Sequence, residues 1–365
     1  MHNRDSSIPI LNPVSTSIPS YSALNDDENS EDASNNSQNS QKLTWSIAIK
    51  SIGNDIVAGF AGALLQFVFA MSYVAGTFAS PRNFDLFGVG VMMGALSIIL
   101  TQSTYSSVSE IPYLFISPDS FYPPLFYSIS TTLSDLIEDD NVYKQTYLLS
   151  IVLSVFTVGA AKWATGRFGI LKLMDYLPYP MVCGLMASVG VSLLQLAVTM
   201  STRNEMQYIP VLIAAFFVGV IQILGQVLNF NPAMTFASLL IVGTIAFYTV
   251  VHLLEISMET AEEQNWVFGR KHTVDKIWIY CISEVGNLRS GIDYSALWAV
   301  SGQFLEIAVL IIIKISLNMA AFEKSLRKRF DKSNEMCKYG IATMLSALCG
   351  AAGTSPSTSI MTVCI

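Results

Sequence analysis

The sequence has 365 residues, of which 52% are hydrophobic and only 13% are charged, with a formal net charge of −7. A soluble domain carries about 25% charged residues, so this composition excludes an ordinary water-soluble protein and predicts a surface covered largely by lipid. There is no basic domain and no basic stripe with interleaved aromatic residues, which argues against a nucleic-acid partner. The five cysteines show no CxxC spacing and predict neither a disulfide framework nor a metal site.

The first 52 residues differ in composition from the rest of the chain. Residues 15–41 are mostly Ser, Asn, Asp, Glu and Gln, with two short acidic runs. Such a segment cannot bury enough apolar surface to offset the entropy lost on ordering, so we predict a disordered acidic tail over residues 1–52. The chain start lacks the apolar core of a signal peptide, and we therefore expect the tail and the N-terminus to be cytosolic.

A series of apolar segments follows the tail. Each is close to the ~20 residues that an α-helix needs to cross a bilayer. The sequence therefore predicts an all-α polytopic membrane domain over residues 53–365, with the lipid bilayer as its partner. The nine predicted spans lie at about 54–78, 86–102, 115–133, 145–161, 178–200, 207–227, 233–254, 295–317 and 336–353, and an incomplete tenth begins near Thr354.

The charges between these segments predict their orientation, because cytosolic loops are enriched in Lys and Arg. With a cytosolic N-terminus, the loops after the fourth and eighth segments face inward, and both are basic. The loop after the third segment faces outward and is acidic. The long outward loop at about 255–294 carries four basic residues and is an exception. The basic residues assigned to the two inward loops are Lys162, Arg167, Lys172, Lys324, Arg327, Lys328, Arg329, Lys332 and Lys338.

Two segments do not have the pattern of ordinary spanning helices. The third opens with Phe115-Ile116-Ser117-Pro118-Asp119-Ser120, and the tenth opens with Gly353-Thr354-Ser355-Pro356-Ser357. We predict an extended piece and then a helix beginning around Pro118. Interrupted segments at corresponding places in two halves indicate a transporter site. A helix that begins inside the membrane offers free N–H groups and a positive dipole end to an anion. Helix caps beside surface turns are the competing interpretation.

Polar and charged side chains inside the predicted spans are further site candidates. Gln66, Phe69 and Tyr73 share one helical face of the first segment, although helix packing would explain them equally well. Glu306, near the middle of the eighth segment, is a candidate for proton coupling. Lys314 lies two turns later and is expected either to pair with Glu306 or to extend towards the membrane surface. Asp119 is either a helix cap or a ligand for cargo that is cationic, zwitterionic or proton-coupled.

Enzymatic motifs are absent from the sequence. It has no HExxH, no GxSxG and no P-loop, and its three histidines are not placed with a partner nucleophile. We therefore expect a protein that is not an enzyme and that needs no cofactor.

Several stretches together resemble the SulP sulfate-permease family of anion transporters. The resemblance runs from about residue 54 to the end of the chain. It rests on the order and spacing of five stretches, which are residues 169–184, 266–268 with 291–297, 317–323, 332–340 and 350–359.

This resemblance implies a fold of seven-plus-seven inverted repeats, with half-helices at segments three and ten. The chain ends in segment ten, so we expect half of the second repeat, and the STAS domain common in the family, to be missing. The implied function is secondary active transport of sulfate or a related inorganic anion by alternating access. Alternatives are an amino-acid or other organic-solute transporter of a vacuolar-type membrane, and a non-transporting truncated protein. Family members often dimerise through the missing parts, and the plasma membrane and an organellar membrane fit equally well.

The resemblance also places the substrate-binding residues by position. It assigns the two half-helix starts to the substrate, and the polar face of the first segment completes the predicted site. The predicted site residues are Gln66, Phe69, Tyr73, Ser117, Pro118, Asp119, Ser120, Thr354, Ser355, Pro356 and Ser357.

Overall fold

The protein was analysed as a computed structural model, and all described residues lie within one compact unit, Asp55–Ile365. The predicted tail over residues 1–52, most of the predicted outward loop and residues 358–365 of segment ten lie outside the described residues. The structure describes residues 56, 59–60, 62–111, 114–171, 178–201, 208–228, 230, 232–257, 260, 291–326 and 330–357.

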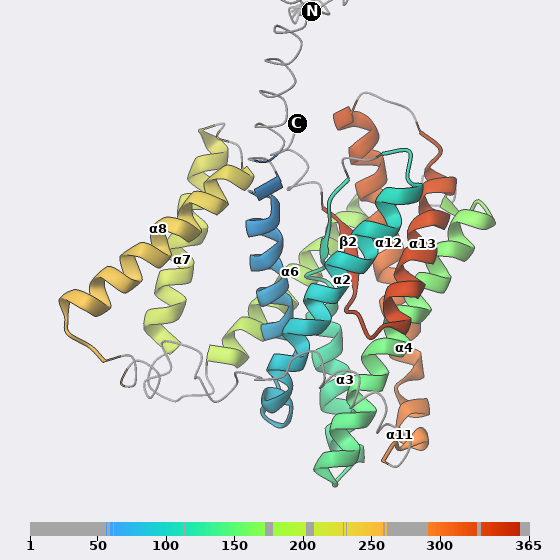
Figure 1. The fold of residues 1–365 in the computed structure, drawn as a ribbon, viewed down its shortest axis with the longest axis horizontal. Helices are drawn as coiled ribbons and strands as arrows, with labels where there is room; N and C mark the ends of the chain where they lie inside the picture. The colour runs from blue at the N-terminus through green and yellow to red at the C-terminus, as the bar shows by residue number, and fades with distance from the viewer. Residues whose placement is uncertain are drawn as a thin grey trace, which may run out of the picture. The chain divides into compact units, whose positions relative to one another are not determined.

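The described chain is mainly helical, with two three-residue strands (Figure 1). A helix lies at each of the nine predicted spans. The elements in chain order are an apolar helix Gly62–Thr77, η1 Pro81–Leu86, α2 Phe87–Val108, β1 Ile116–Pro118, α3 Tyr122–Leu136, α4 Asp140–Arg167, α6 Tyr179–Ser201, α7 Tyr208–Val227, α8 Pro232–Leu253, α11 Tyr294–Ala299, α12 Ser301–Leu326, α13 Lys332–Leu348 and β2 Thr354–Pro356.

Three of these helices are long and apolar enough to cross a membrane by themselves, among the residues that the structure describes. They cover Phe87–Val108, Asp140–Arg167 and Ser301–Glu323. Four shorter apolar helices accompany them in the first segment, α6, α7 and α8. The coarse prediction of a polytopic helical membrane protein is therefore confirmed.

Short polar signals in the sequence fix several helix ends. Asp139, Asp293 and Asp331 are the N-caps of α4, α11 and α13, and each carboxylate accepts two backbone N–H groups of the following turn. Gly169 follows α4 with a φ of +67°, and Gly350 follows α13 with a φ of +77°. Glycine adopts this left-handed conformation without steric cost, which ends each helix within two residues.

Helices α4 and α13 pack with their backbones close together. A Cβ atom added to Gly340 would collide with the backbone of Trp163, and one added to Gly159 would lie within 2.8 Å of the Met344 nitrogen. Small residues at such positions allow close helix contact in membranes. The pairing joins a helix of the first half of the chain to a helix of the second half.

Several sequence-based boundaries differ from the structure. Helix α12 continues to Leu326 and α13 begins at Lys332, so Lys324, Lys332 and Lys338, which were predicted in a loop, lie in helices. Two further differences concern the candidate site. Helix α3 begins at Tyr122 and not around Pro118, because Pro118 belongs to β1 and the Asp119 carboxylate accepts the Phe121 N–H in the turn before the helix. Helix α4 extends to Arg167, well past the predicted end at 161. Lys162 is therefore not in a loop but inside α4, where it is completely buried.

Candidate functional site: the crossing of the two strands

Strands β1 and β2 form an antiparallel pair that brings the two unusual segments together. Ser117 lies opposite Ser355, and Pro118 lies opposite Thr354. Two further backbone hydrogen bonds extend the pair, from Asp119 N to the Gly353 carbonyl at 3.3 Å and from Ser357 N to the Phe115 carbonyl at 2.9 Å. The segments predicted to form the site are thus joined directly, and we call this pair the crossing.

Side chains from two helices hold β1 in place. The Gln66 amide donates to the Ile116 carbonyl at 2.9 Å, from the first apolar helix. The Gln102 side chain of α2 accepts from the Ile116 N–H at 2.7 Å and donates to the Leu114 carbonyl at 3.0 Å. Because a buried backbone group without a partner is costly, these amides stabilise an extended strand within a helical bundle.

β2 has a matching set of supports. The Asn318 amide of α12 donates to the Pro356 carbonyl at 3.0 Å. The Tyr73 hydroxyl accepts from the Gly353 N–H at 3.2 Å, just before the strand. Tyr73 is buried and makes edge-on ring contacts with Tyr122 of α3. The predicted residues Gln66 and Tyr73 are thus at the crossing, where they bond its backbone.

An ion pair lies beside the crossing. The Lys314 ammonium of α12 pairs with Asp119 Oδ1 and lies 3.4 Å from the Ser355 hydroxyl and 4.3 Å from the centre of the Phe121 ring. Asp119 is only 1% exposed, and its Oδ2 atom has no hydrogen-bond partner among the described residues. Lys314 therefore pairs with Asp119 and not with Glu306, and the charged groups sit next to the serine pair of the two strands.

The start of α3 offers few free N–H groups to an anion. The Phe121 N–H donates to the Asp119 carboxylate at 3.0 Å, and the Tyr122 N–H donates to the Asp119 carbonyl at 3.2 Å. Pro123 and Pro124 have no N–H group at all. Asp119 thus acts as a cap while it pairs with Lys314, and any anion recognition at this end depends on the lysine and the hydroxyl groups.

A second lysine also contacts the crossing. The Lys162 ammonium of α4 donates to the Thr354 carbonyl at 3.3 Å and to the Thr343 hydroxyl at 3.2 Å. It also lies 4.0 Å from the centre of the Tyr339 ring, whose hydroxyl is 3.1 Å from the Thr354 hydroxyl. Sequence reasoning placed Lys162 in a loop and missed this position. The sequence signal for this burial was the glycines of α4 and α13, Gly159 and Gly340, because they allow the two helices to pack closely around Lys162.

The other predicted residues take different places. Ser117, Ser355 and Thr354 are buried at the crossing, whereas Ser120 is exposed and Phe69 is half-buried. Glu306 is exposed on α12. It therefore lies away from the buried charges of the crossing, and its role in proton coupling remains a prediction.

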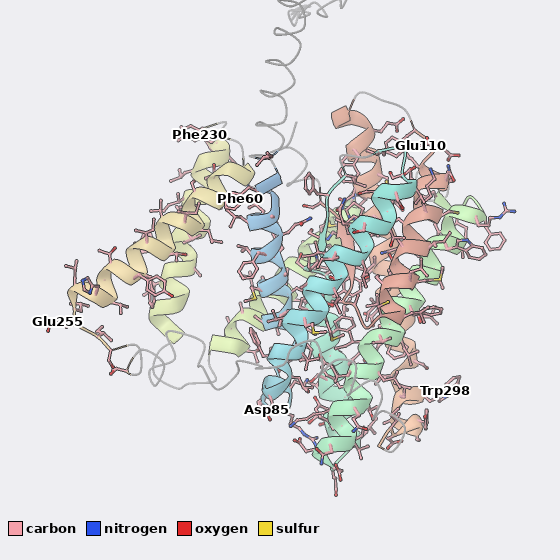
Figure 2. All side chains as sticks on the ribbon, viewed as in Figure 1. Phe60, Asp85, Glu110, Phe230, Glu255 and Trp298 are labelled. Atoms are coloured by element: carbon pink, nitrogen blue, oxygen red, sulfur yellow. The ribbon has the colours of Figure 1, made fainter. Side chains whose placement is uncertain are left out.

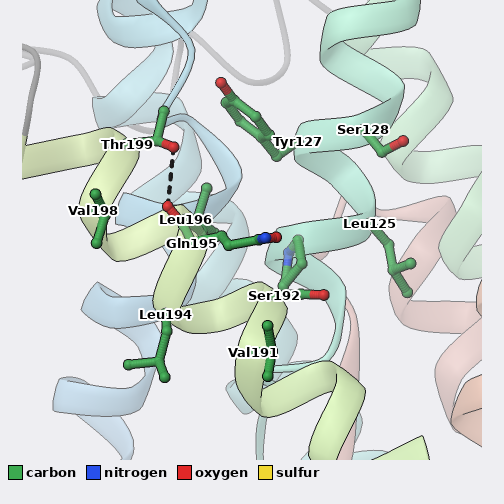
Figure 3. A pocket seen from close by; sticks show the side chains of 11 residues that line it. Leu125, Tyr127, Ser128, Val191, Ser192, Leu194, Gln195, Leu196, Val198 and Thr199 are labelled. Carbon is green, nitrogen blue, oxygen red and sulfur yellow. Dashed lines mark hydrogen bonds between the residues drawn. The ribbon is translucent and has the colours of Figure 1, made fainter.

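A separate cavity of about 750 Å³ lies between α3 and α6 (Figure 3). Its wall is mostly apolar, and polar groups are contributed by both helices. None of the predicted site residues lines it, although Pro124 in its wall belongs to the first turn of α3. The lining residues are Pro124, Leu125, Tyr127, Ser128, Val191, Ser192, Leu194, Gln195, Leu196, Val198 and Thr199.

A cluster of hydrogen bonds joins the end of α2 to the start of α13. The Glu335 carboxylate accepts from the Tyr105 hydroxyl at 2.5 Å, the Ser109 hydroxyl at 2.7 Å, the Glu110 N–H at 3.0 Å and the Lys338 ammonium at 3.0 Å. Burial acts to raise the pKa of Glu335, but these donors together hold its pKa below the ordinary value. Figure 2 shows Glu110 and Trp298 at opposite ends of the helices that surround the crossing.

No family model matches the chain. The chain is 20% identical over 321 residues to the vacuolar basic amino acid transporter VSB1 of Saccharomyces cerevisiae. The match covers 80% of this chain, but this chain spans only 30% of the length of the yeast protein. Its structure resembles the transmembrane domain of the cyanobacterium bicarbonate transporter BicA, with a TM-score of 0.54 and 15% identity over 86% of this chain and 76% of that one.

The chain has a transporter-type membrane fold. Both matched proteins are transporters and not enzymes, in agreement with the expectation from sequence. At 15% identity the structural likeness shows the fold alone.

Proposed function

We propose that the full-length protein is a secondary active transporter that binds a small oxyanion at the crossing of β1 and β2. The observation that carries the proposal is the position of the Lys314 ammonium, which lies between the Asp119 carboxylate and the Ser355 hydroxyl. A lysine held there by one carboxylate has further N–H donors for a ligand. Sulfate and related inorganic anions have the acceptor oxygens that these donors require.

The serine pair adds the groups that replace water around a bound solute. Ser117 and Ser355 lie opposite each other, and each is buried although its hydroxyl is polar. Buried hydroxyl groups gain most from a ligand because bulk water cannot solvate them. An oxyanion that contacts Lys314 would reach the Ser355 hydroxyl in the same position.

Alternating access needs two parts that move relative to each other around the site. Helices α2, α4, α12 and α13 and the two strands form one tightly packed bundle, while α6 contacts α3 beside a cavity of about 750 Å³. We infer that α6 is the neighbour against which this bundle moves. The cavity then marks the side on which α3 and α6 separate.

Transport of an amino acid is the second candidate. Asp119 Oδ2 is buried and unpaired among the described residues, so it offers an acceptor to an ammonium group beside Lys314. A zwitterion would place its carboxylate on Lys314 and its ammonium on Asp119, replacing one ion pair by two. The yeast protein that matches this chain is named a basic amino acid transporter, which also favours this candidate.

Uptake of labelled sulfate, bicarbonate, chloride and lysine into vesicles that contain the full-length protein tests both candidates. The variants are Asp119→Asn and Ser355→Ala. Ser188→Ala is the matched control, because Ser188 is an exposed serine on α6 whose hydroxyl donates to the Leu185 backbone carbonyl of its own helical turn. Loss of one hydrogen bond from Ser355 should raise the KM for the anion about threefold to tenfold.

The two candidates differ in their response to Asp119→Asn. An anion needs Lys314 and not the carboxylate, so anion uptake should survive this change. Amino-acid uptake should be abolished, because the ammonium group loses its partner. Absence of uptake of every solute, at normal protein levels, would contradict the proposed function.

A further inference from the structure

Lys162 is an ionisable side chain that is completely buried in the bundle. It lies between α4 and α13, and its exposed fraction is 0%. Its ammonium contacts the Thr354 carbonyl, the Thr343 hydroxyl and the face of the Tyr339 ring. Helices α4 and α13 are closely packed beside it, at Gly159 and Gly340. The ammonium is therefore held against the Thr354 carbonyl of β2.

The charge of Lys162 is not neutralised by direct contact. Among the residues that the structure describes, it forms no ion pair, whereas Lys144, Lys314 and Lys338 each pair with a carboxylate. The charged groups that act on it across the crossing are Asp119 and Lys314. With Lys162 protonated, one carboxylate and two ammonium groups give these three residues a net charge of +1. A negatively charged solute at the crossing favours this protonated form of Lys162.

The two lysines hold neighbouring residues of the same strand. Lys162 bonds the carbonyl of Thr354, and Lys314 lies beside the hydroxyl of Ser355. Thr354 is paired with Pro118 in the register that places Ser355 opposite Ser117. A shift of Thr354 would therefore displace the serine pair, so the position of β2 depends on Lys162.

We propose that Lys162 is a positioning and specificity-determining residue of the crossing, which fixes β2 and makes the site select a solute with a net negative charge. The inference rests on the proposed function and deepens it, because it decides between the two candidate cargos. A buried charge acts strongly over several ångströms, since little water is present to screen it. The excess charge favours an oxyanion and disfavours a basic amino acid.

Three substitutions separate the charge of Lys162 from its hydrogen bonds. Lys162→Gln removes the charge but retains N–H donors, Lys162→Arg retains the charge, and Lys162→Met removes both. Lys144→Gln is the matched control, because Lys144 is on the same helix but pairs with Asp85 and Asp140 at its other end. Each variant of the full-length protein is tested in vesicles with sulfate, bicarbonate and lysine as probes, and KM and the maximal rate are measured separately.

We expect Lys162→Gln to raise the KM for the transported anion about tenfold, as loss of one charge interaction of about 1.4 kcal/mol would. Lys162→Arg should stay within about threefold of the wild type, and Lys144→Gln should be unchanged. A residue that only stabilises the fold would lower the amount of protein and the maximal rate without changing KM. An unchanged anion KM in Lys162→Gln would overturn the inference, as would a wild type that transports lysine and no anion.

A binding measurement separates failure of this inference from failure of the proposed function. The melting temperature of the purified full-length protein is measured with increasing sulfate or bicarbonate, for the wild type and for Lys162→Gln. If the wild type transports nothing but is stabilised by the anion, and Lys162→Gln is not, transport is contradicted and the role of Lys162 is supported. Equal stabilisation of both proteins, or none of either, overturns the role of Lys162.

Discussion

The bundle around the crossing (α2, α4, α12, α13 and the two strands) differs from helices α6 to α8 in the burial of its polar residues and in the closeness of its packing. In the bundle, polar residues are completely buried and hydrogen-bonded, as Lys162, Glu335 and Thr343 show. Neighbouring groups approach so closely that an added methyl group would collide with the Trp163 backbone at Gly340 and with the Tyr122 ring at Gly353. Interactions of this kind fix one arrangement of the chain.

Helices α6, α7 and α8 instead present large apolar side chains outward. Leu194 is 69% exposed, Phe216 68%, Val227 71% and Leu253 75%. Glycines at 190, 219 and 243 have no atoms within 4 Å of an added Cβ. In a membrane such surfaces are compatible with lipid. The comparison indicates that the bundle contains the buried polar and charged groups of the candidate site. Helices α6 to α8 provide an apolar surface, where we expect a single substitution to change stability little.

Breaking the Asp119–Lys314 ion pair should have the largest effect on the bundle. Lys314→Met leaves Asp119 buried without its partner, which costs about 3–5 kcal/mol of stability. Thermal unfolding in detergent measures the change, and transport should be lost. The double variant Asp119→Asn/Lys314→Met should recover most of the stability but no transport. A Lys314→Met single variant as stable as the wild type would show that the ion pair contributes nothing to stability.

The sequence was sufficient to predict the helices, because membrane spans need long apolar stretches and the described chain has a helix at each of the nine positions. The family resemblance placed the two proline-marked segments at one site, whereas their strand pairing and the register of Ser117 with Ser355 come from the structure. Local composition indicates where a helix is interrupted, but not which distant segment supplies the missing backbone partners.

The charges of the site were much harder to predict. Lys314 pairs with a residue 195 positions away, although Glu306 is two turns from it on the same helix. The side of the helix decides the pairing, because the position of Glu306 on α12 is exposed while Lys314 turns inward. Lys162 was counted as a loop residue because hydropathy ends the segment at the first lysine. Only the packing of α4 against α13 shows that this lysine is enclosed.

The cluster at Glu335 offers a smaller perturbation of the same bundle. Glu335→Gln removes a carboxylate that accepts four hydrogen bonds from the end of α2 and from α13. We expect a loss of about 1.5–3 kcal/mol, measured by unfolding at neutral pH. Since the pKa of Glu335 in the folded protein lies below its ordinary value of 4.5, its contribution is complete above that value and is lost as the pH falls through the lower folded pKa.

The control for this prediction is the same unfolding measurement repeated at a series of pH values. The stability difference between the wild type and Glu335→Gln should shrink as the medium becomes acidic below about pH 4.5, because the wild-type carboxyl then takes up a proton. A difference that stays constant over this range would mean that the charge of Glu335 contributes nothing, and that only the shape of its side chain matters.

A pair of glycine substitutions tests the comparison of the two regions directly. Gly340→Ala places a methyl group against the backbone of Trp163, so it should destabilise the protein by about 1–3 kcal/mol. Gly219→Ala, in α7, meets no atom within 4 Å and should stabilise its helix by about 0.5–1 kcal/mol. Both changes are measured by thermal unfolding. Equal effects at the two positions would contradict the distinction between a closely packed bundle and an open helical surface.

Glu306→Gln should have the smallest effect on binding, because this carboxylate is exposed on α12 and belongs to neither the ion pair nor the strand supports. We expect the KM of the cargo to stay within about twofold, as is usual for a surface substitution away from such features. A carboxylate in a membrane-spanning helix is nevertheless a candidate for proton movement, so uptake driven by an imposed proton gradient should fall. Uptake with the gradient abolished is the control. A variant that keeps the full response to the gradient would remove Glu306 from the transport cycle.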